Sequence, residues 1–135
     1  MRMVIGICVL AVACVTQDTT SSFDIPYFYE DLPQSQSLVL QYINKYQKAV
    51  CLTPSDWPNS AGRLDQDPSN VWIEIEGKRF GIRPFNTGYC PKCARKVKPG
   101  DHITGKISYN DFDVPTHLYG AKKSLHFQPK GFHCK

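Results

Sequence analysis

Apolar and polar residues follow two different periods along the chain, and these periods divide it into a helical part and a stranded part. Over residues 35–52 the apolar residues recur at spacings of three and four, and most residues between them are Gln, Asn or Lys. This spacing places one apolar stripe along a helix, so it predicts an amphipathic helix over residues 35–52. The stripe consists of Val39, Tyr42, Ile43, Tyr46, Ala49 and Val50.

From Val71 onward the apolar residues alternate with polar ones, which is the period of a half-buried strand. Residues 71–82 predict a two-stranded hairpin with its turn around Gly77, and residues 101–109 and 122–128 predict two more strands. We therefore expect an α+β fold, in which one N-terminal amphipathic helix packs on a small antiparallel sheet of about four strands. Such a sheet is either open or partly closed into a barrel.

Residues 53–70 connect the predicted helix to the hairpin and hold three prolines among many other turn-forming residues. We expect an extended loop here, and long loops in compact domains are often functional. Trp57 lies in this loop. Two interpretations of it stay open, because its ring either plugs the core or contacts a ligand.

The start of the chain has the order of an export signal. Arg2 precedes an apolar run over residues 4–13, which is too short to cross a bilayer as a helix, and small residues lead up to Cys14. The stretch LAVAC resembles the lipobox of bacterial lipoproteins, although Ala11 stands where Leu is commoner. The resemblance implies that Cys14 is lipidated and becomes the mature N-terminus. Plain secretion is the alternative.

These features divide the chain into three parts. Residues 1–13 are expected to form an export signal peptide, residues 14–34 a lipidated or free N-terminal tether, and residues 35–135 a single disulfide-stabilised domain. The lipobox resemblance implies an outer-membrane lipoprotein in a bacterium with two membranes, because Val15 rather than Asp follows Cys14. A periplasmic or a secreted protein is the other possibility.

Four cysteines follow the leader, and the oxidising environment outside the cytoplasm favours disulfides among them. They are Cys51, Cys90, Cys93 and Cys134. We predict that Cys51 bonds to one of Cys90 and Cys93, and that Cys134 bonds to the other. Two alternatives start from Cys90 and Cys93. The pair suits a redox-active dithiol, or it supplies two ligands of a zinc site that Cys51 with Cys134 or His133 would complete. We expect neither a metal nor another cofactor.

Charge is unevenly distributed along the chain. Residues 15–70 hold three Lys or Arg against seven Asp or Glu, whereas residues 71–135 hold twelve against five. A basic surface attracts anionic partners over long distances, so we expect an anionic envelope component, or another envelope protein, as the partner. Nucleic acid is not expected. The candidate ligand-binding residues are Arg95, Lys96, Lys98, Trp57 and His117, and the wider basic patch adds Lys92, Lys122, Lys123 and Lys130.

Catalysis has weaker support in the sequence than binding. The chain contains no nucleophile elbow, phosphate loop or HExxH motif, and no residue is predicted to be catalytic. The best catalytic region is the loop over residues 110–120. A small secreted hydrolase that uses His102 or His117 as its base is therefore an alternative, and an exported CxxC dithiol or metal-binding protein is another. We expect a lipid-anchored binding module.

Overall fold

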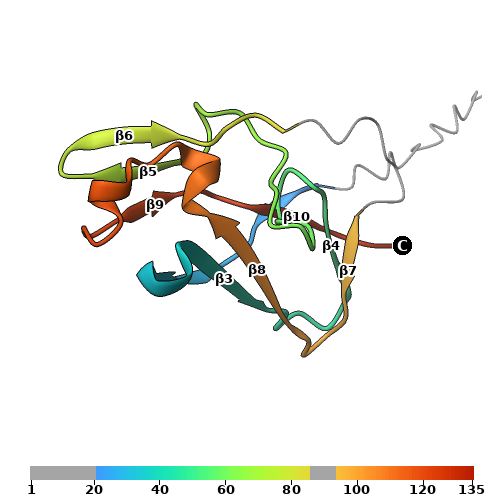
Figure 1. The fold of residues 1–135 in the computed structure, drawn as a ribbon. Helices are drawn as coiled ribbons and strands as arrows, with labels where there is room; N and C mark the ends of the chain where they lie inside the picture. The colour runs from blue at the N-terminus through green and yellow to red at the C-terminus, as the bar shows by residue number, and fades with distance from the viewer. Residues whose placement is uncertain (1–20, 86–93) are drawn as a thin grey trace, which may run out of the picture.

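The computed structural model describes residues 21–85 and 94–135, and the regular secondary structure of this part of the chain is mostly β-strand (Figure 1). It contains ten strands and three short 3₁₀ helices. The predicted α+β fold is therefore wrong, because no described segment forms an α-helix. The 3₁₀ helices are η1 (Pro33–Ser35), η2 (Tyr109–Phe112) and η3 (Thr116–Leu118).

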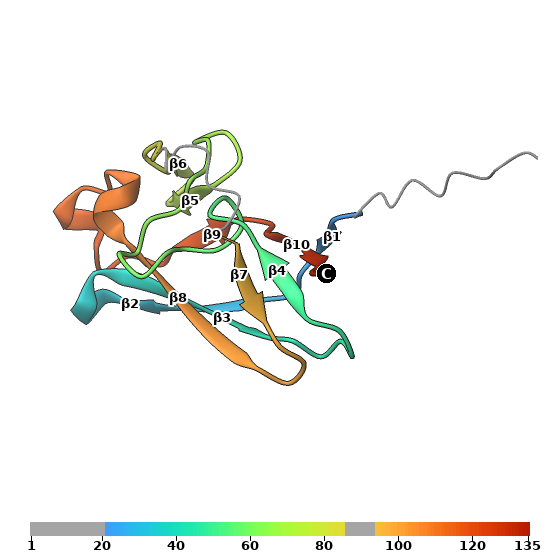
Figure 2. The same ribbon diagram turned by 90° about the vertical axis from the view of Figure 1, so that its right-hand side faces the viewer.

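All the described strand pairs are antiparallel and belong to three sheets. The strand orders are β1-β10-β4-β7, β2-β3-β8 and β6-β5-β9. The sheets pack around one shared core, to which each contributes (Figures 1 and 2). The strands are β1 (Phe23–Asp24), β2 (Phe28–Leu32), β3 (Ser37–Ile43), β4 (Val50–Leu52), β5 (Trp72–Ile75), β6 (Lys78–Gly81), β7 (Arg95–Val97), β8 (His102–Ser108), β9 (Ser124–His126) and β10 (Lys130–His133).

The segment predicted as a helix forms β3, a loop and β4. Leu38, Leu40 and Tyr42 alternate along β3 and are at most 1% exposed, whereas Ile43 and Tyr46 of the proposed helical stripe are 39% and 42% exposed. The apolar residues of this segment fit the helical spacing of three and four as well as the strand spacing of two. Local spacing therefore did not decide between a helix and a strand. The pairing of β3 with β2 and β8 decides for the strand, because it buries every second residue, namely Leu38, Leu40 and Tyr42.

Asn44 directly follows β3 and organises the loop to β4. Its side chain is buried, and Nδ2 donates to the carbonyl oxygens of Lys48 and Val97, each at 3.0 Å. Its Oδ1 accepts a hydrogen bond from the backbone N–H of Tyr46 at 2.9 Å. One amide side chain thus satisfies three backbone groups and holds this loop against β7.

Replacing Asn44 with Ala is expected to lower the free energy of unfolding by about 2 kcal/mol, because buried backbone groups lose their partners. Urea titration measures this change. Gln47→Ala is the matched control, since Gln47 is exposed in the same loop, and it should change stability by less than about 0.5 kcal/mol. Equal effects of the two substitutions would contradict the role given to Asn44.

The predicted strands after residue 70 are confirmed. Residues 71–82 contain the hairpin of β5 and β6, in which Ile73 faces Phe80 across the pair, and its turn has Gly77 at a φ of 78°. Residues 101–109 contain β8, and residues 122–128 contain β9. In this half of the chain polar residues separate the apolar ones regularly, so only one period fits.

Candidate functional site

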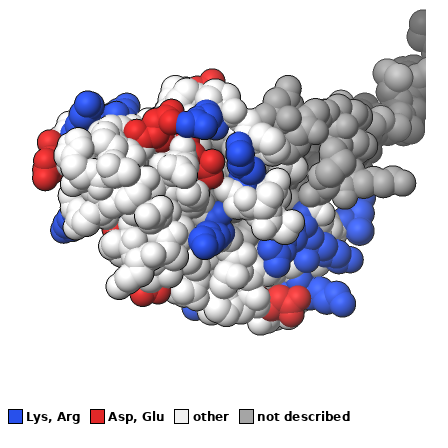
Figure 3. Space-filling model, in the orientation of Figure 1, with Lys and Arg blue, Asp and Glu red and all other residues white. Residues whose placement is uncertain are grey.

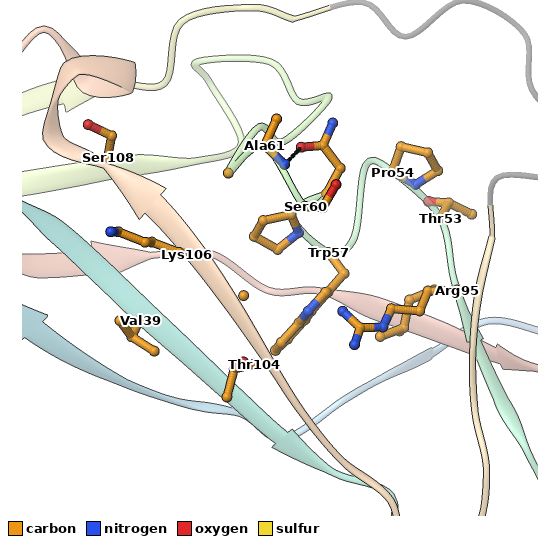
Figure 4. A pocket seen from close by; sticks show the side chains of 15 residues that line it. Val39, Thr53, Pro54, Trp57, Ser60, Ala61, Arg95, Thr104, Lys106 and Ser108 are labelled. Carbon is orange, nitrogen blue, oxygen red and sulfur yellow. Dashed lines mark hydrogen bonds between the residues drawn. The ribbon is translucent and has the colours of Figure 1, made fainter.

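A groove of about 1050 Å³ lies between β8, the start of β7 and the loop that follows β4. Figure 4 shows its lining from close by. We call it the β7–β8 groove. Its lining residues are Val39, Leu52, Thr53, Pro54, Trp57, Pro58, Asn59, Ser60, Ala61, Gly62, Arg95, Thr104, Gly105, Lys106 and Ser108.

Trp57 forms the centre of the groove wall. Its side chain is only 2% exposed and belongs to the core, which confirms the interpretation of Trp57 as a plug. The indole lies directly on β8, because a Cβ placed on Gly105 would come within 3.0 Å of both Trp57 Nε1 and Pro58. A residue larger than Gly at position 105 would push the loop away from β8. The core thus holds the groove wall in place.

Two cationic side chains border the groove on opposite sides of Trp57 (Figure 4). Arg95 begins β7, and Lys106 lies on the outward face of β8, opposite Val39 of β3. Neither cation makes a hydrogen bond or an ion pair with another residue in the described ranges. Lys and Arg side chains also lie over β7 and β8 on the face seen in Figure 3. The lining of the groove therefore carries two positive charges.

Backbone polar groups of β8 also face the groove. β8 is the last strand of its sheet, and its ladder with β3 is flanked by the hydrogen bonds Asn44 N–H to Asp101 O and Tyr109 N–H to Gln36 O. Because bonded and non-bonded pairs alternate in an antiparallel ladder, Thr104 and Lys106 direct their backbone groups away from β3. Gly62 lies against one of these groups, since a Cβ on it would be 2.9 Å from Lys106 O.

The structure divides the predicted binding residues. Arg95 and Trp57 meet in the groove. Lys96 is exposed, but the alternation of β7 places it on the opposite face of the strand from Arg95. Lys98 lies at the turn into β8, where its carbonyl accepts from Asp101 N–H, and His117 lies in η3 beyond the other end of β8.

Lys123 and Lys130 do not belong to a free basic patch, so this part of the prediction is wrong. The Lys123 side chain is fully buried and forms an ion pair with Asp31 at 3.2 Å. Its ammonium group also donates to the carbonyl oxygens of Tyr119 and Ala121. Lys130 forms an ion pair with Asp24. Only Lys122 of the three later lysines is exposed without such a contact to another described residue.

The acidic residues of the loop over residues 110–120 have structural partners. Asp113 pairs with Arg83, and this pairing raises the pKa of the arginine. Asp111 lies 3.8 Å from Arg63, and burial raises the pKa of its carboxyl group although Arg63 opposes the shift. These contacts tie the loop to the segments before and after the β5–β6 hairpin, and they account for its carboxylates without catalysis.

The predicted cysteine pairing is wrong for the two described cysteines. Cys51 of β4 bonds to Cys134, which follows β10, with a Cα–Cα distance of 5.4 Å. β4 and β10 are neighbours in the sheet, and this proximity brings the two cysteines within bonding distance. Cys14, Cys90 and Cys93 lie outside the described residues, so the proposed lipidation and the dithiol and zinc alternatives stay predictions.

The four histidines lie apart from one another or have aromatic neighbours. His102 contacts the Gln41 side chain at 3.0 Å, and His126 stacks on Trp72 with ring centroids 4.9 Å apart. His102 and His126 belong to different sheets, so they do not form the pair that adjacent strands would have allowed. Within residues 21–85 and 94–135, no cluster of three or more His, Cys, Asp or Glu residues is arranged to hold a metal ion.

The sequence interpretation missed Lys106 and the edge of β8 that pairs with no other strand. The alternation over residues 101–109 already placed Lys106 on the polar face, but nothing local indicated that Arg95 would lie across from it.

Comparison with known proteins adds no relative, since no family model matches the chain and no curated protein is detectably similar to it. None of the described helices is long and apolar enough to cross a membrane.

Proposed function

We propose that this protein is an exported binding module, anchored by a lipid on Cys14, that holds an anionic component of the cell envelope in the β7–β8 groove. The observation that carries the proposal is the placement of Arg95 and Lys106 on opposite sides of one groove, with no ion pair to another described residue. Cations placed on two sides of a hollow favour a ligand that carries negative charge along its length.

The remaining groove groups suit an extended anionic ligand. Thr104 and Lys106 offer outward backbone donors and acceptors along β8, which can bond polar groups of a polymer or a peptide. Pro54 and Ala61 supply apolar contact area beside them. The expected ligand is therefore an acidic envelope polymer, and an acidic segment of an envelope protein is the second candidate.

Replacing Arg95 and Lys106 together with Ser is expected to weaken binding of poly-L-glutamate, used as an anionic probe, by roughly tenfold at low salt. The salt dependence of binding should also decrease, because fewer charges take part. Isothermal titration at several salt concentrations measures both quantities. An acidic envelope polymer, such as lipopolysaccharide or a teichoic acid, is titrated in parallel to identify the class of ligand.

The matched control is the double substitution K96S/K98S, which removes the same number of positive charges outside the groove lining. It should reduce probe binding by no more than about twofold, through the loss of long-range attraction alone. If both double variants weaken binding equally, the protein attracts anions by its net charge and the groove is not the site. Unchanged binding by R95S/K106S would refute the proposal.

A further inference from the structure

A second surface feature is a cluster of exposed apolar side chains at the start of β2 and the end of β3. Phe28 is 52% exposed, Ile43 39% and Tyr46 42%. With Pro26, Tyr27, Tyr42 and Lys45 they surround a shallow hollow of about 380 Å³. We call this surface the aromatic patch, and its apolar members are Pro26, Tyr27, Phe28, Ile43 and Tyr46.

The chain enters the folded domain beside the aromatic patch. Phe23 of β1 packs on Tyr46 with ring centroids 5.0 Å apart, and β1 lies at the same end of the molecule as the loop between β3 and β4 (Figure 2). Nine residue steps separate Cys14 from Phe23, and an extended chain of that length spans at most about 30 Å. A lipid on Cys14 would therefore keep this end of the domain close to the bilayer.

The chemistry of the patch suits the interface between lipid and water. Tyr and Phe rings are enriched at this depth, and Lys45 and Lys48 flank Tyr46 in the same exposed loop. Lysine side chains there extend toward anionic headgroups while their methylene groups stay in apolar surroundings. The hydroxyl group of Tyr27 donates to the carbonyl oxygen of Phe127 at 2.7 Å, so this polar group of the patch has a partner within the domain.

We propose that the aromatic patch rests on an anionic bilayer surface, with Phe28, Ile43 and Tyr46 inserted at headgroup level. This inference rests on the lipid anchor of the proposed function, because the anchor supplies the proximity. It also fixes the orientation of the domain, since the face that meets the bilayer is defined. A second copy of the chain is the competing occupant of the patch, and the experiments below separate the two.

The first experiment uses the lipidated full-length product, reconstituted in vesicles of phosphatidylethanolamine and phosphatidylglycerol that contain brominated acyl chains. In the F28W variant the fraction of tryptophan emission quenched by bromine should exceed that of the unsubstituted chain, whose Trp57 and Trp72 provide the background. S124W is the control, because Ser124 is exposed on β9 in a different sheet. Equal quenching in F28W and S124W would overturn the proposal.

The second experiment tests the patch without the lipid, in a chain that carries Cys14→Ser. Partition to the same vesicles, measured by co-sedimentation, should fall roughly tenfold when F28S and I43S are added. Adding R95S and K106S instead should leave at least half of the partition. The proposal is refuted if F28S/I43S partitions like its parent, or if the parent does not bind vesicles at all.

Two further outcomes are decisive. If the parent chain dimerises in sedimentation analysis without vesicles and F28S/I43S abolishes the dimer, the patch is a self-association surface and the membrane proposal fails.

Intact mass of the exported product shows whether Cys14 carries a lipid. Without that lipid the anchor in the proposed function fails, and the C14S partition experiment alone then decides whether the patch binds a bilayer. Binding of poly-L-glutamate tests the groove separately.

Discussion

Replacing Lys123 with Met is expected to lower the free energy of unfolding by about 3 to 5 kcal/mol, which is the usual cost of removing one partner from a buried ion pair. The Lys123 side chain is fully buried, and its Nζ lies 3.2 Å from Asp31 and 4.4 Å from the centre of the Tyr109 ring. Asp31 also accepts a hydrogen bond from the Tyr109 hydroxyl group. Met preserves the volume but leaves Asp31 without its cation.

A double variant separates the charge effect from a packing effect. In K123M/D31N the neutral Asn can still accept from Tyr109, so this variant should be more stable than K123M, and urea titration gives the difference. K122M is the matched control, because Lys122 is exposed one residue away, and its effect should stay below about 0.5 kcal/mol. A K123M variant as stable as K122M would show that the buried network contributes little.

Loss of the Cys51–Cys134 disulfide is expected to lower the free energy of unfolding by about 4.5 kcal/mol. The bond joins residues 83 positions apart, and closing a loop of that length strongly restricts the unfolded chain. Urea titration of C51S/C134S should therefore show a much lower midpoint than the oxidised parent. Reduction of the parent with dithiothreitol should lower its midpoint by a similar amount.

The pairing itself is tested by a chain in which Cys90 and Cys93 are both replaced with Ser. This C90S/C93S variant should still form the bond between Cys51 and Cys134, and non-reducing peptide mapping should recover the two peptides joined. A map of the unsubstituted chain that links Cys51 to Cys90 or Cys93 would contradict the pairing described above.

The second half of the fold could be predicted from the sequence better than the first. The reason is that the spacing of apolar residues in the second half fits only a strand, whereas in the first half it fits both a helix and a strand. In residues 71–82 only alternation fits, so the hairpin of β5 and β6 follows directly from the order of residues. In residues 35–52 a helix and two strands fit equally well. Contacts with β8, about 60 residues later, decide the outcome, and local spacing carries no information about them.

The candidate site shows the same limit. Arg95 and Trp57 were predicted as separate ligand contacts, and their meeting in one groove depends on the packing of the loop after β4 against Gly105. Lys123 was predicted to be a surface cation because nothing near it in the sequence announces a partner. Asp31, which lies 92 positions earlier, provides that partner. The number of charged residues can be read from a sequence, but only the fold shows which of them lie at the surface and which are buried.

The position of β10 in its sheet has a consequence for the order of events during biosynthesis. β10 lies between β1 and β4, so Phe23 pairs with Gly131 and Cys51 lies opposite Phe132. Neither partner can complete its native pairing until the residues of β10 have been made. The sheet of β1, β10, β4 and β7 therefore cannot close until residues 130–133 have been synthesised, whatever has formed before them.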